Sequence, residues 1–215
     1  MAQIFPKSAN KLPLLTVALA GFLLVGAVGG VWYYGSPQYT DVGYRPHQPV
    51  AYSHKLHAGD LGIDCRYCHT TVETSAKANV PPTSTCMNCH TIIRPESEKL
   101  AMIRSSYTDT IPMQWVKVHD LPDYAYFNHG VHVRAGVGCY SCHGNVAEME
   151  EVTQVSSLSM GWCLDCHRNP DPHLRPVSEV TNMYYKPPAD QAAFAAAQKA
   201  ALNLNPPENC TACHR

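Results

Sequence analysis

The pattern of apolar and polar residues divides the chain sharply near its beginning. Residues 12–34 contain no charged side chain, lysines precede them at Lys7 and Lys11, and aromatic residues occupy positions 32–34. A helix of about 20 apolar residues is long enough to cross a lipid bilayer. Lysines mark the cytoplasmic side of such a helix, and tryptophan and tyrosine rings favour the membrane interface. The pattern therefore predicts a transmembrane helix over residues 12–34.

This helix sets the expected location of the remaining chain. Residues 1–11 would form a cytoplasmic N-terminus, and residues 35–215 would lie on the periplasmic side of the cytoplasmic (inner) membrane. A cleaved signal peptide is the alternative, because the glycine and alanine residues at 26–30 would suit a signal peptidase. We expect a retained, single-pass anchor.

Beyond the anchor, proline residues interrupt the pattern so often that neither long helices nor sheets are expected. Helices are predicted over residues 96–105 and over the alanine-rich residues 190–202, where Asp190 is a suitable N-terminal cap. Residues 35–215 are thus predicted to form a domain of short helices with little regular secondary structure.

The cysteine spacing indicates the chemistry of this domain. All ten cysteines fall in five copies of Cys-x-x-Cys-His, so none is left for a disulfide. Each copy provides two thiols that form thioethers with a porphyrin, and an adjacent imidazole that binds the iron as proximal ligand. The thioether residues are Cys65, Cys68, Cys86, Cys89, Cys139, Cys142, Cys163, Cys166, Cys210 and Cys213, and the proximal histidines are His69, His90, His143, His167 and His214.

Two other interpretations of these motifs are weaker. A redox-active dithiol followed by a chance histidine would explain one copy but not five. Pairs of cysteines also bind zinc, but a zinc site gives no reason for a histidine after every pair. We therefore predict five covalently bound haem c groups, with short helices wrapped around them as a multihaem cytochrome c.

An internal repeat organises the predicted pentahaem domain. Residues 52–65 align with residues 127–139, and each unit combines an aromatic residue, a His-x-x-His pair, a glycine-bearing turn and two haem motifs. We predict one dihaem module over residues 50–105, a second over residues 119–175, and a C-terminal haem segment over residues 176–215.

Seven histidines remain once the five proximal ones are set aside. Histidines three positions apart on a helical turn project from one face and can reach two neighbouring haems. The two His-x-x-His pairs are therefore predicted to supply distal ligands, namely His54, His57, His129 and His132. For the fifth iron we prefer His119. The alternatives are His173, His47 and a methionine, either Met160 or Met183, which would raise the potential of that haem.

Composition and charge narrow the functional classes. Only 4 Phe and 3 Trp are available to fill an interior, so the haems themselves must provide apolar mass. The outer domain has few residues for each haem, which implies closely packed macrocycles, as an electron relay needs. A formal net charge of −1 offers no footprint for nucleic acid. Haem propionates would make the holoprotein more acidic and would favour a basic cytochrome as redox partner.

Three functions fit a membrane-anchored multihaem protein. The first is an electron-transfer subunit of a larger complex, with no substrate of its own. The second is a stand-alone quinol dehydrogenase that feeds a periplasmic reductase, and the third is a catalytic reductase. A catalytic haem needs an open iron, and seven spare histidines for five irons give no indication of one. No catalytic residue is predicted.

Several stretches resemble the pentahaem cytochrome c subunit of bacterial alternative complex III, a menaquinol:acceptor oxidoreductase. They are residues 1–6, 49–59, 81–90 and 160–168, and the similarity runs over nearly the whole chain. These stretches include residues around the haem motifs as well as the motifs themselves. The resemblance favours the first of the three functions.

The resemblance also implies partners. It implies an iron–sulfur subunit and polytopic quinol-binding membrane subunits in the same complex, so that this chain would not hold the quinol site itself. A monohaem cytochrome c or a terminal oxidase would accept the electrons. His47 and His173 lie outside the resembling stretches, so the resemblance assigns them no ligand role.

Overall fold

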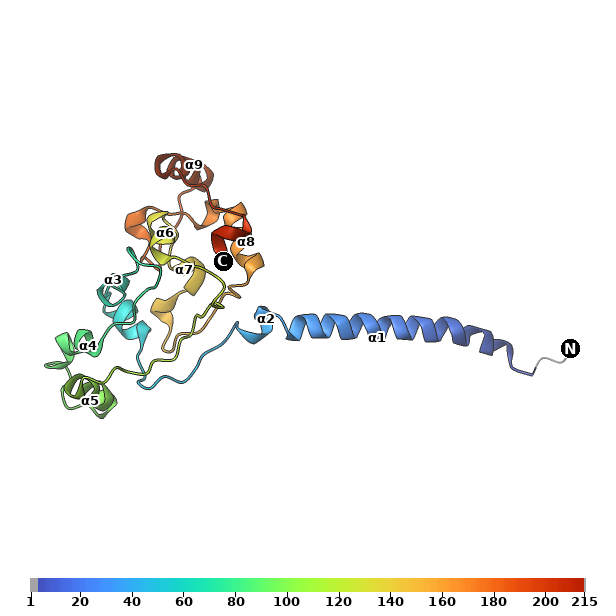
Figure 1. Ribbon diagram of the computed structural model, residues 1–215, viewed down its shortest axis with the longest axis horizontal. Coiled ribbons are helices and arrows are strands. Elements are labelled where there is room, and N and C mark those ends of the chain that lie inside the picture. Colours follow the sequence, from blue (N-terminus) through green and yellow to red (C-terminus); the bar gives the residue numbers. More distant parts are fainter. Residues whose placement is uncertain (1–3, 215) are drawn as a thin grey trace. The chain divides into compact units, whose positions relative to one another are not determined.

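The computed structural model describes residues 4–214 and divides into two compact units between Asp41 and Val42 (Figure 1). Residues 1–3, which belong to the predicted cytoplasmic segment and to the first resembling stretch, lie outside the described residues. Arg215, the last residue of the predicted C-terminal haem segment, also lies outside them.

The first unit is dominated by one long helix. It contains the 3-10 helix η1 (Lys7–Lys11), the helix α1 (Leu12–Tyr34) and the short helix α2 (Pro37–Thr40). No residue of α1 is buried, and Trp32 remains 79% exposed. A helix that is apolar all round is typical of a membrane span, and among the described residues only this helix is long and apolar enough to be one. The helix is confirmed at its predicted bounds, while its passage through a membrane stays a prediction.

The second unit consists of short helices joined by irregular segments. Its α-helices are α3 (Cys65–Cys68), α4 (Thr83–His90), α5 (Ala101–Asp109), α6 (His129–Arg134), α7 (Tyr140–His143), α8 (Met160–Arg168), α9 (Gln191–Leu202) and α10 (Cys210–Cys213). A π-type helix, η2 (Lys55–Asp60), and the 3-10 helices η3 (Glu98–Leu100), η4 (Val146–Glu148), η5 (Asp171–His173) and η6 (Val177–Glu179) lie between them. The described residues form isolated bridges but no strand. The predicted fold class is confirmed.

The two helices predicted from local sequence differ in how well their bounds agree. Helix α9 begins where expected, because the Asp190 carboxylate accepts a hydrogen bond from the Ala193 backbone N–H at 2.9 Å. The helix predicted over residues 96–105 starts later, with η3, and continues as α5 to Asp109. It ends there because Thr110 adopts a left-handed backbone conformation with φ of 55°. Glycine is the residue that usually signals such a helix end, and the sequence has none at this position.

The buried apolar side chains of the second unit are few and small. They include Val72, Val133 and Val180, which pack together as a cluster. Single buried residues such as Ile103 and Ala195 support α5 and α9. Such a core is thin for a unit of this length, so packing against a further apolar mass is needed to stabilise the fold. Bound haem would provide that mass.

Each of the two repeats contacts the other through an equivalent segment. The backbone of Gly59 in η2 packs directly on the Ala147 carbonyl of η4, so closely that a Cβ would clash with it. In the mirrored contact, Gly130 of α6 packs on the Glu73 carbonyl, with no room for a side chain. The His-x-x-His segment of each repeat therefore lies against the chain that follows the first haem motif of the other repeat. The repeat seen in the sequence becomes one interlocked pair in space.

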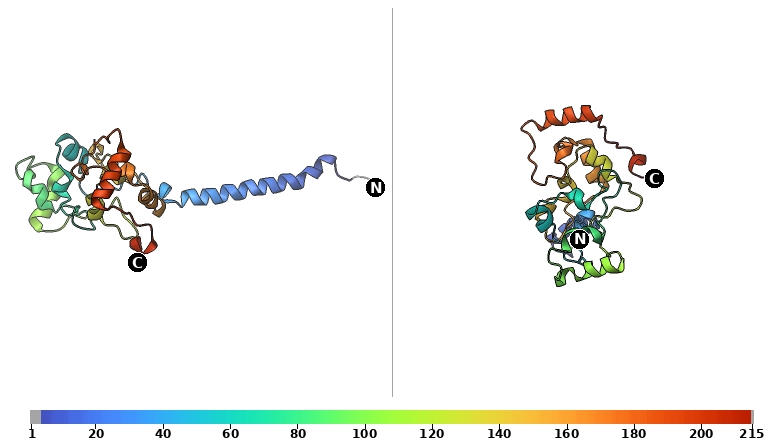
Figure 2. Two further views of the ribbon diagram at one scale, coloured as in Figure 1. Left: turned by 90° about the horizontal axis from the view of Figure 1, so that it is seen from above. Right: turned by 90° about the vertical axis from the view of Figure 1, so that its left-hand side faces the viewer.

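The outer parts of the second unit lie around this pair. Helices α4 and α5 lie at one end of the unit and α9 at the other, with α3, α6 and α7 between them (Figures 1 and 2). The first and third haem motifs, on α3 and α7, therefore lie between the two ends of the unit.

Candidate haem site

The five Cys-x-x-Cys-His motifs all lie on single helical turns. Helices α3, α7 and α10 consist of little else, α4 ends on the histidine of its motif, and α8 ends one residue after its motif. Residues three apart on a helix share a face, so each turn presents its two thiols together. None of the ten cysteines forms a disulfide, and all of them are described. The thiols are thus free and paired as thioether attachment requires.

Backbone carbonyls set the tautomer of four proximal imidazoles. The Nδ1–H groups of His69, His90, His167 and His214 donate to the carbonyls of Asn79 at 2.7 Å, Ile93 at 2.9 Å, Pro207 at 2.6 Å and Tyr124 at 3.1 Å, respectively. A carbonyl oxygen can only accept, so the hydrogen must reside on Nδ1. Nε2 then keeps its lone pair, and the hydrogen bond orients the ring and raises its basicity as an iron ligand.

Three predicted distal histidines show the same arrangement. His57 donates through Nδ1 to the Ser53 carbonyl at 2.8 Å, and His132 donates likewise to the Asn128 carbonyl at 2.8 Å. His129 donates to the Ala76 carbonyl of the other repeat at 2.9 Å. In each case Nε2 is left as a free acceptor.

The aromatic residue that precedes the His-x-x-His pair in each repeat also has a structural role. The Tyr52 ring lies 4.5 Å from that of His57 and nearly parallel to it, and it meets His54 edge-on at 4.8 Å. Phe127 packs in the same manner on His132 at 4.4 Å and on His129 at 4.7 Å. Each aromatic side chain therefore holds both histidines of its pair in fixed orientations.

Three predicted distal histidines each lie close to one predicted proximal histidine. Metal–nitrogen bonds of about 2.0 Å and a ring centre about 1 Å behind each nitrogen place two opposite ligands of one iron about 6 Å apart. The measured ring-centroid distances are 6.3 Å for His57 with His90, 6.1 Å for His132 with His167, and 6.4 Å for His129 with His143. All three distances suit ligands on opposite faces of one haem.

His54 completes this pattern by its place in the repeat. It corresponds to His129, and burial lowers its pKa to about 4, with the charges of His69 and His57 as smaller causes. Its Nδ1 is buried without a hydrogen-bond partner. A buried imidazole that is held neutral beside His69 is suited to metal ligation. We pair His54 with His69 by this equivalence.

His119, the preferred ligand for the fifth iron, lies against the proximal histidine of the third motif. Its ring meets that of His143 edge-on at 4.3 Å, which is too close for the two to bind opposite faces of one iron. Its Nε2 is buried and has no hydrogen-bond partner, and burial lowers its pKa. The role of His119 stays a prediction, now excluding the position opposite His143.

The alternatives for the fifth distal ligand lie in varied surroundings. His47 is exposed, and Met160 is 61% exposed on the first turn of α8. His173 and Met183 are half-buried, and burial lowers the pKa of His173.

Comparison with known proteins bears on the same residues. Residues 36–121 match the model of the class III cytochrome c family, and residues 125–215 match that of cytochrome c7 and related cytochromes c. Together these ranges contain all five Cys-x-x-Cys-His motifs. The chain is a multihaem cytochrome c. Its free thiol pairs and its ring nitrogens, which are oriented as iron ligands, fit c-type haem.

The cytochrome is also similar to a curated protein. It is 25% identical over 168 residues to the multihaem cytochrome c subunit of a menaquinone reductase from Nitratidesulfovibrio vulgaris. The aligned part covers 68% of the cytochrome and 78% of that relative.

Contacts between neighbouring motifs connect them in one series. The Asn88 amide of the second motif donates to the Tyr67 hydroxyl of the first at 3.1 Å. The thiols of Cys65 and Cys139, in the first and third motifs, interact with one another, because each is the largest cause of the other's pKa shift, which lowers the pKa of Cys65 and raises that of Cys139. The two histidines of α6 then connect the third motif with the fourth.

The fourth motif in turn contacts the segment that leads into the fifth. The His167 ring donates to the Pro207 carbonyl, and the Arg168 guanidinium forms an ion pair with Glu208 at 3.2 Å. The motifs therefore follow one another in the order second, first, third, fourth and fifth.

The carbonyl acceptors of these imidazoles were not found from the sequence. Each is a main-chain group, so no residue type signals it, and Asn79, Ile93 and Pro207 have nothing in common as side chains. A repeat-based alignment would have suggested only the aromatic supports, Tyr52 and Phe127.

Proposed function

We propose that this cytochrome is the electron-transfer subunit of a membrane quinol-oxidising respiratory complex of the alternative complex III type. The supporting observation is the continuous series of motif contacts that runs from α4 through α3, α7 and α8 to α10. Haems attached to such a series lie in a row of neighbours, and the protein contributes their spacing, ligation and burial. The function is a relay through five c-type haems that ends on a cytochrome c or a terminal oxidase.

The ligand pattern favours relay over catalysis. Four of the proposed irons have a histidine assigned on each face, which leaves no open position for a substrate. His54, His57, His129 and His132 are the proposed distal ligands of these four, and His119 remains our preference for the fifth. Menaquinone appears in the name of the similar protein, which is the multihaem cytochrome c subunit of a menaquinone reductase.

The proposed setting follows from α1 and from the resemblance. Helix α1 anchors the cytochrome in the cytoplasmic membrane with its N-terminus inside, and the haem domain faces the periplasm. An iron–sulfur subunit delivers electrons, and polytopic subunits of the same complex bind the quinol.

Haem content tests the first part of the proposal. The intact holoprotein is expected to weigh five haem groups more than the unmodified chain in mass spectrometry. Replacing both cysteines of any one motif by alanine is expected to remove one haem. A wild-type mass with fewer than five groups would show that a motif is not used.

A reduction experiment separates the relay from the stand-alone quinol dehydrogenase that is our second hypothesis. Menaquinol is added to the purified single cytochrome and, in parallel, to the complex purified with its partners. The relay predicts rapid haem reduction in the complex and slow reduction in the isolated chain. Equally rapid reduction of the isolated chain would show that it holds a quinol site and would contradict the relay.

A further inference from the structure

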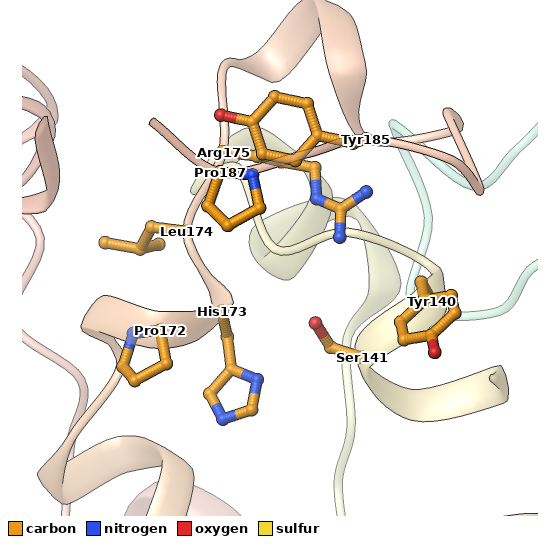
Figure 3. Close-up of a pocket in the computed structure, with 8 residues that line it drawn as sticks. All are labelled: Tyr140, Ser141, Pro172, His173, Leu174, Arg175, Tyr185 and Pro187. Carbon is orange, nitrogen blue, oxygen red and sulfur yellow. The ribbon is translucent and has the colours of Figure 1, made fainter. Parts of the chain in front are cut away.

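A pocket of about 310 Å³ lies beside the third haem motif (Figure 3). Tyr140 and Ser141, the two residues between Cys139 and Cys142, form one wall. His173, the last residue of η5, and Arg175, two residues after it, form another. Figure 3 shows the Arg175 guanidinium, the Ser141 hydroxyl and the His173 imidazole around the same space. The pocket thus gathers hydrogen-bond donors close to a point of haem attachment.

Arg175 is the unusual residue of this pocket. It is only 8% exposed, although arginine is seldom buried without a partner of opposite charge. One guanidinium nitrogen donates to the Asn182 carbonyl at 2.8 Å, and the guanidinium carbon lies 4.9 Å from the centre of the Tyr185 ring. Its Nε–H is buried with no acceptor. None of the ion pairs formed by the described residues involves Arg175.

The surrounding backbone holds the guanidinium in this place. Gly138 packs directly on it, so that even a Cβ at that position would clash with the guanidinium. The Arg175 backbone N–H donates to the Gly136 carbonyl at 2.9 Å, and the Gln198 amide of α9 donates to the Arg175 carbonyl at 2.9 Å. The fold therefore fixes a cation in a buried position rather than letting it extend into solvent.

Burying a cation that forms no ion pair is unfavourable, and burial lowers the pKa of Arg175, which the nearby charge of Glu179 offsets only in part. A carboxylate would remove this penalty, because the planar guanidinium donates two parallel hydrogen bonds to its two oxygens. Each c-type haem brings two carboxylates as propionates, and they need partners in a domain with few residues for each haem. We propose that Arg175 and its pocket bind a haem propionate of this cytochrome.

This inference rests on the proposed haem content, and a redox titration of the holoprotein tests it. In Arg175→Gln the positive charge beside one haem is lost, so the oxidised state of that haem becomes relatively more stable. One of the five midpoint potentials is expected to fall at pH 8, where the propionate is ionised, while the other four stay within error. Arg175→Lys keeps the charge and should recover most of the shift.

Two further variants make the comparison decisive. Gly138→Ala keeps the arginine but displaces its guanidinium, so it should lower the same potential and serves if Arg175→Gln fails to load haem. Arg45→Gln removes an exposed arginine that is paired with Glu151 and should change none of the potentials. Five loaded haems with unchanged potentials in Arg175→Gln or in Gly138→Ala would overturn the inference. A wild-type protein with fewer than five haems would instead contradict the proposed function.

The source of the carboxylate is distinguished by adding sodium acetate at constant ionic strength. A propionate that is already held in the pocket predicts no change of the wild-type potentials with acetate. A shift that saturates in the wild type and is absent in Arg175→Gln would show that the pocket takes carboxylates from solution, and would overturn the assignment to a propionate.

Discussion

A single hydrogen position decides whether an imidazole of this cytochrome can bind iron through Nε2. Seven of the histidines chosen from the sequence donate through Nδ1 to a main-chain carbonyl, and neither His47 nor His173 forms such a hydrogen bond in the described structure. This hydrogen bond therefore marks seven of the ten predicted ligands, while His54, His119 and His143 lack it among the described contacts. It supports the relay with residue-level detail.

Exchange of one proposed distal ligand should change one haem. His132→Met replaces a second imidazole by a thioether, which raises the haem potential relative to two histidines. One midpoint potential is therefore expected to rise, with a thioether-to-iron absorption band appearing in the oxidised spectrum. His47→Met is the matched control and should leave all potentials unchanged. If the two variants behaved alike, His132 would not be a ligand.

Asp64 should stabilise the first haem motif in a manner that depends on pH. Its carboxylate caps α3 by accepting from the Arg66 backbone N–H and also accepts from the Arg66 side chain and from Thr181. Asp64→Ala is expected to lower the free energy of unfolding by about 1 kcal/mol at pH 7. Denaturant unfolding monitored by haem absorbance measures this loss.

The sign of the pH dependence follows from the pKa of Asp64. The Arg66 hydrogen bond lowers it from the ordinary value of 3.8 to about 2. The stabilisation is thus complete above pH 3.8 and is lost as the pH falls through about 2. The difference between wild type and Asp64→Ala should shrink in acid, whereas Asp123→Ala, at an exposed position, should show little difference at any pH. A difference that grew in acid would contradict this account.

The short helices depend on close backbone contact between the repeats. Gly59 in η2 and Gly130 in α6 each press against a carbonyl of the other repeat, and both neighbours are main-chain atoms that cannot rotate away. This contact positions the His-x-x-His segments against the first and third motifs. It explains the glycine two residues after His57 in the first repeat and the glycine directly after His129 in the second.

Adding one methyl group at these contacts should separate the repeats. Gly59→Ala and Gly130→Ala are each expected to lower the free energy of unfolding by about 1–3 kcal/mol, as overpacked sites do. Gly161→Ala on α8 has open space around the new methyl group and should change stability by less than about 1 kcal/mol. Equal effects at all three positions, measured by denaturant unfolding, would show that the interlocked contact does not stabilise the fold.

The whole molecule combines an exposed apolar helix with a haem domain that is compact by its internal contacts. The compact-unit boundary after Asp41 leaves every haem motif in the second unit. A chain that lacks residues 1–34 and carries a cleavable export signal should therefore still bind haem. It is expected in the soluble fraction, while the full-length cytochrome is expected in the membrane fraction. Haem-stained fractions report the outcome, and a truncated protein that remained with the membrane in the absence of partner subunits would contradict anchoring by α1.

Local chemistry explains what the sequence determined by itself. Thioether attachment and proximal ligation use residues within five consecutive positions, so the five motifs could be recognised without a fold. The same holds for α1, whose length and apolar character lie in one segment, and for α9, whose cap precedes it directly. The repeat also allowed four distal histidines to be chosen, since it preserves their spacing.

The tertiary structure decided everything that joins distant segments. His57 meets His90 and His132 meets His167 because folding brings separate helices of the same repeat together, and no spacing in the chain encodes those pairs. The order of the motifs, with the second before the first, likewise depends on packing. The sequence around Arg175 does not indicate that its side chain is buried. The pairing of histidines, the order of the motifs and the burial of a charge all depend on which distant segments pack together and exclude water. Only the folded chain determines that packing.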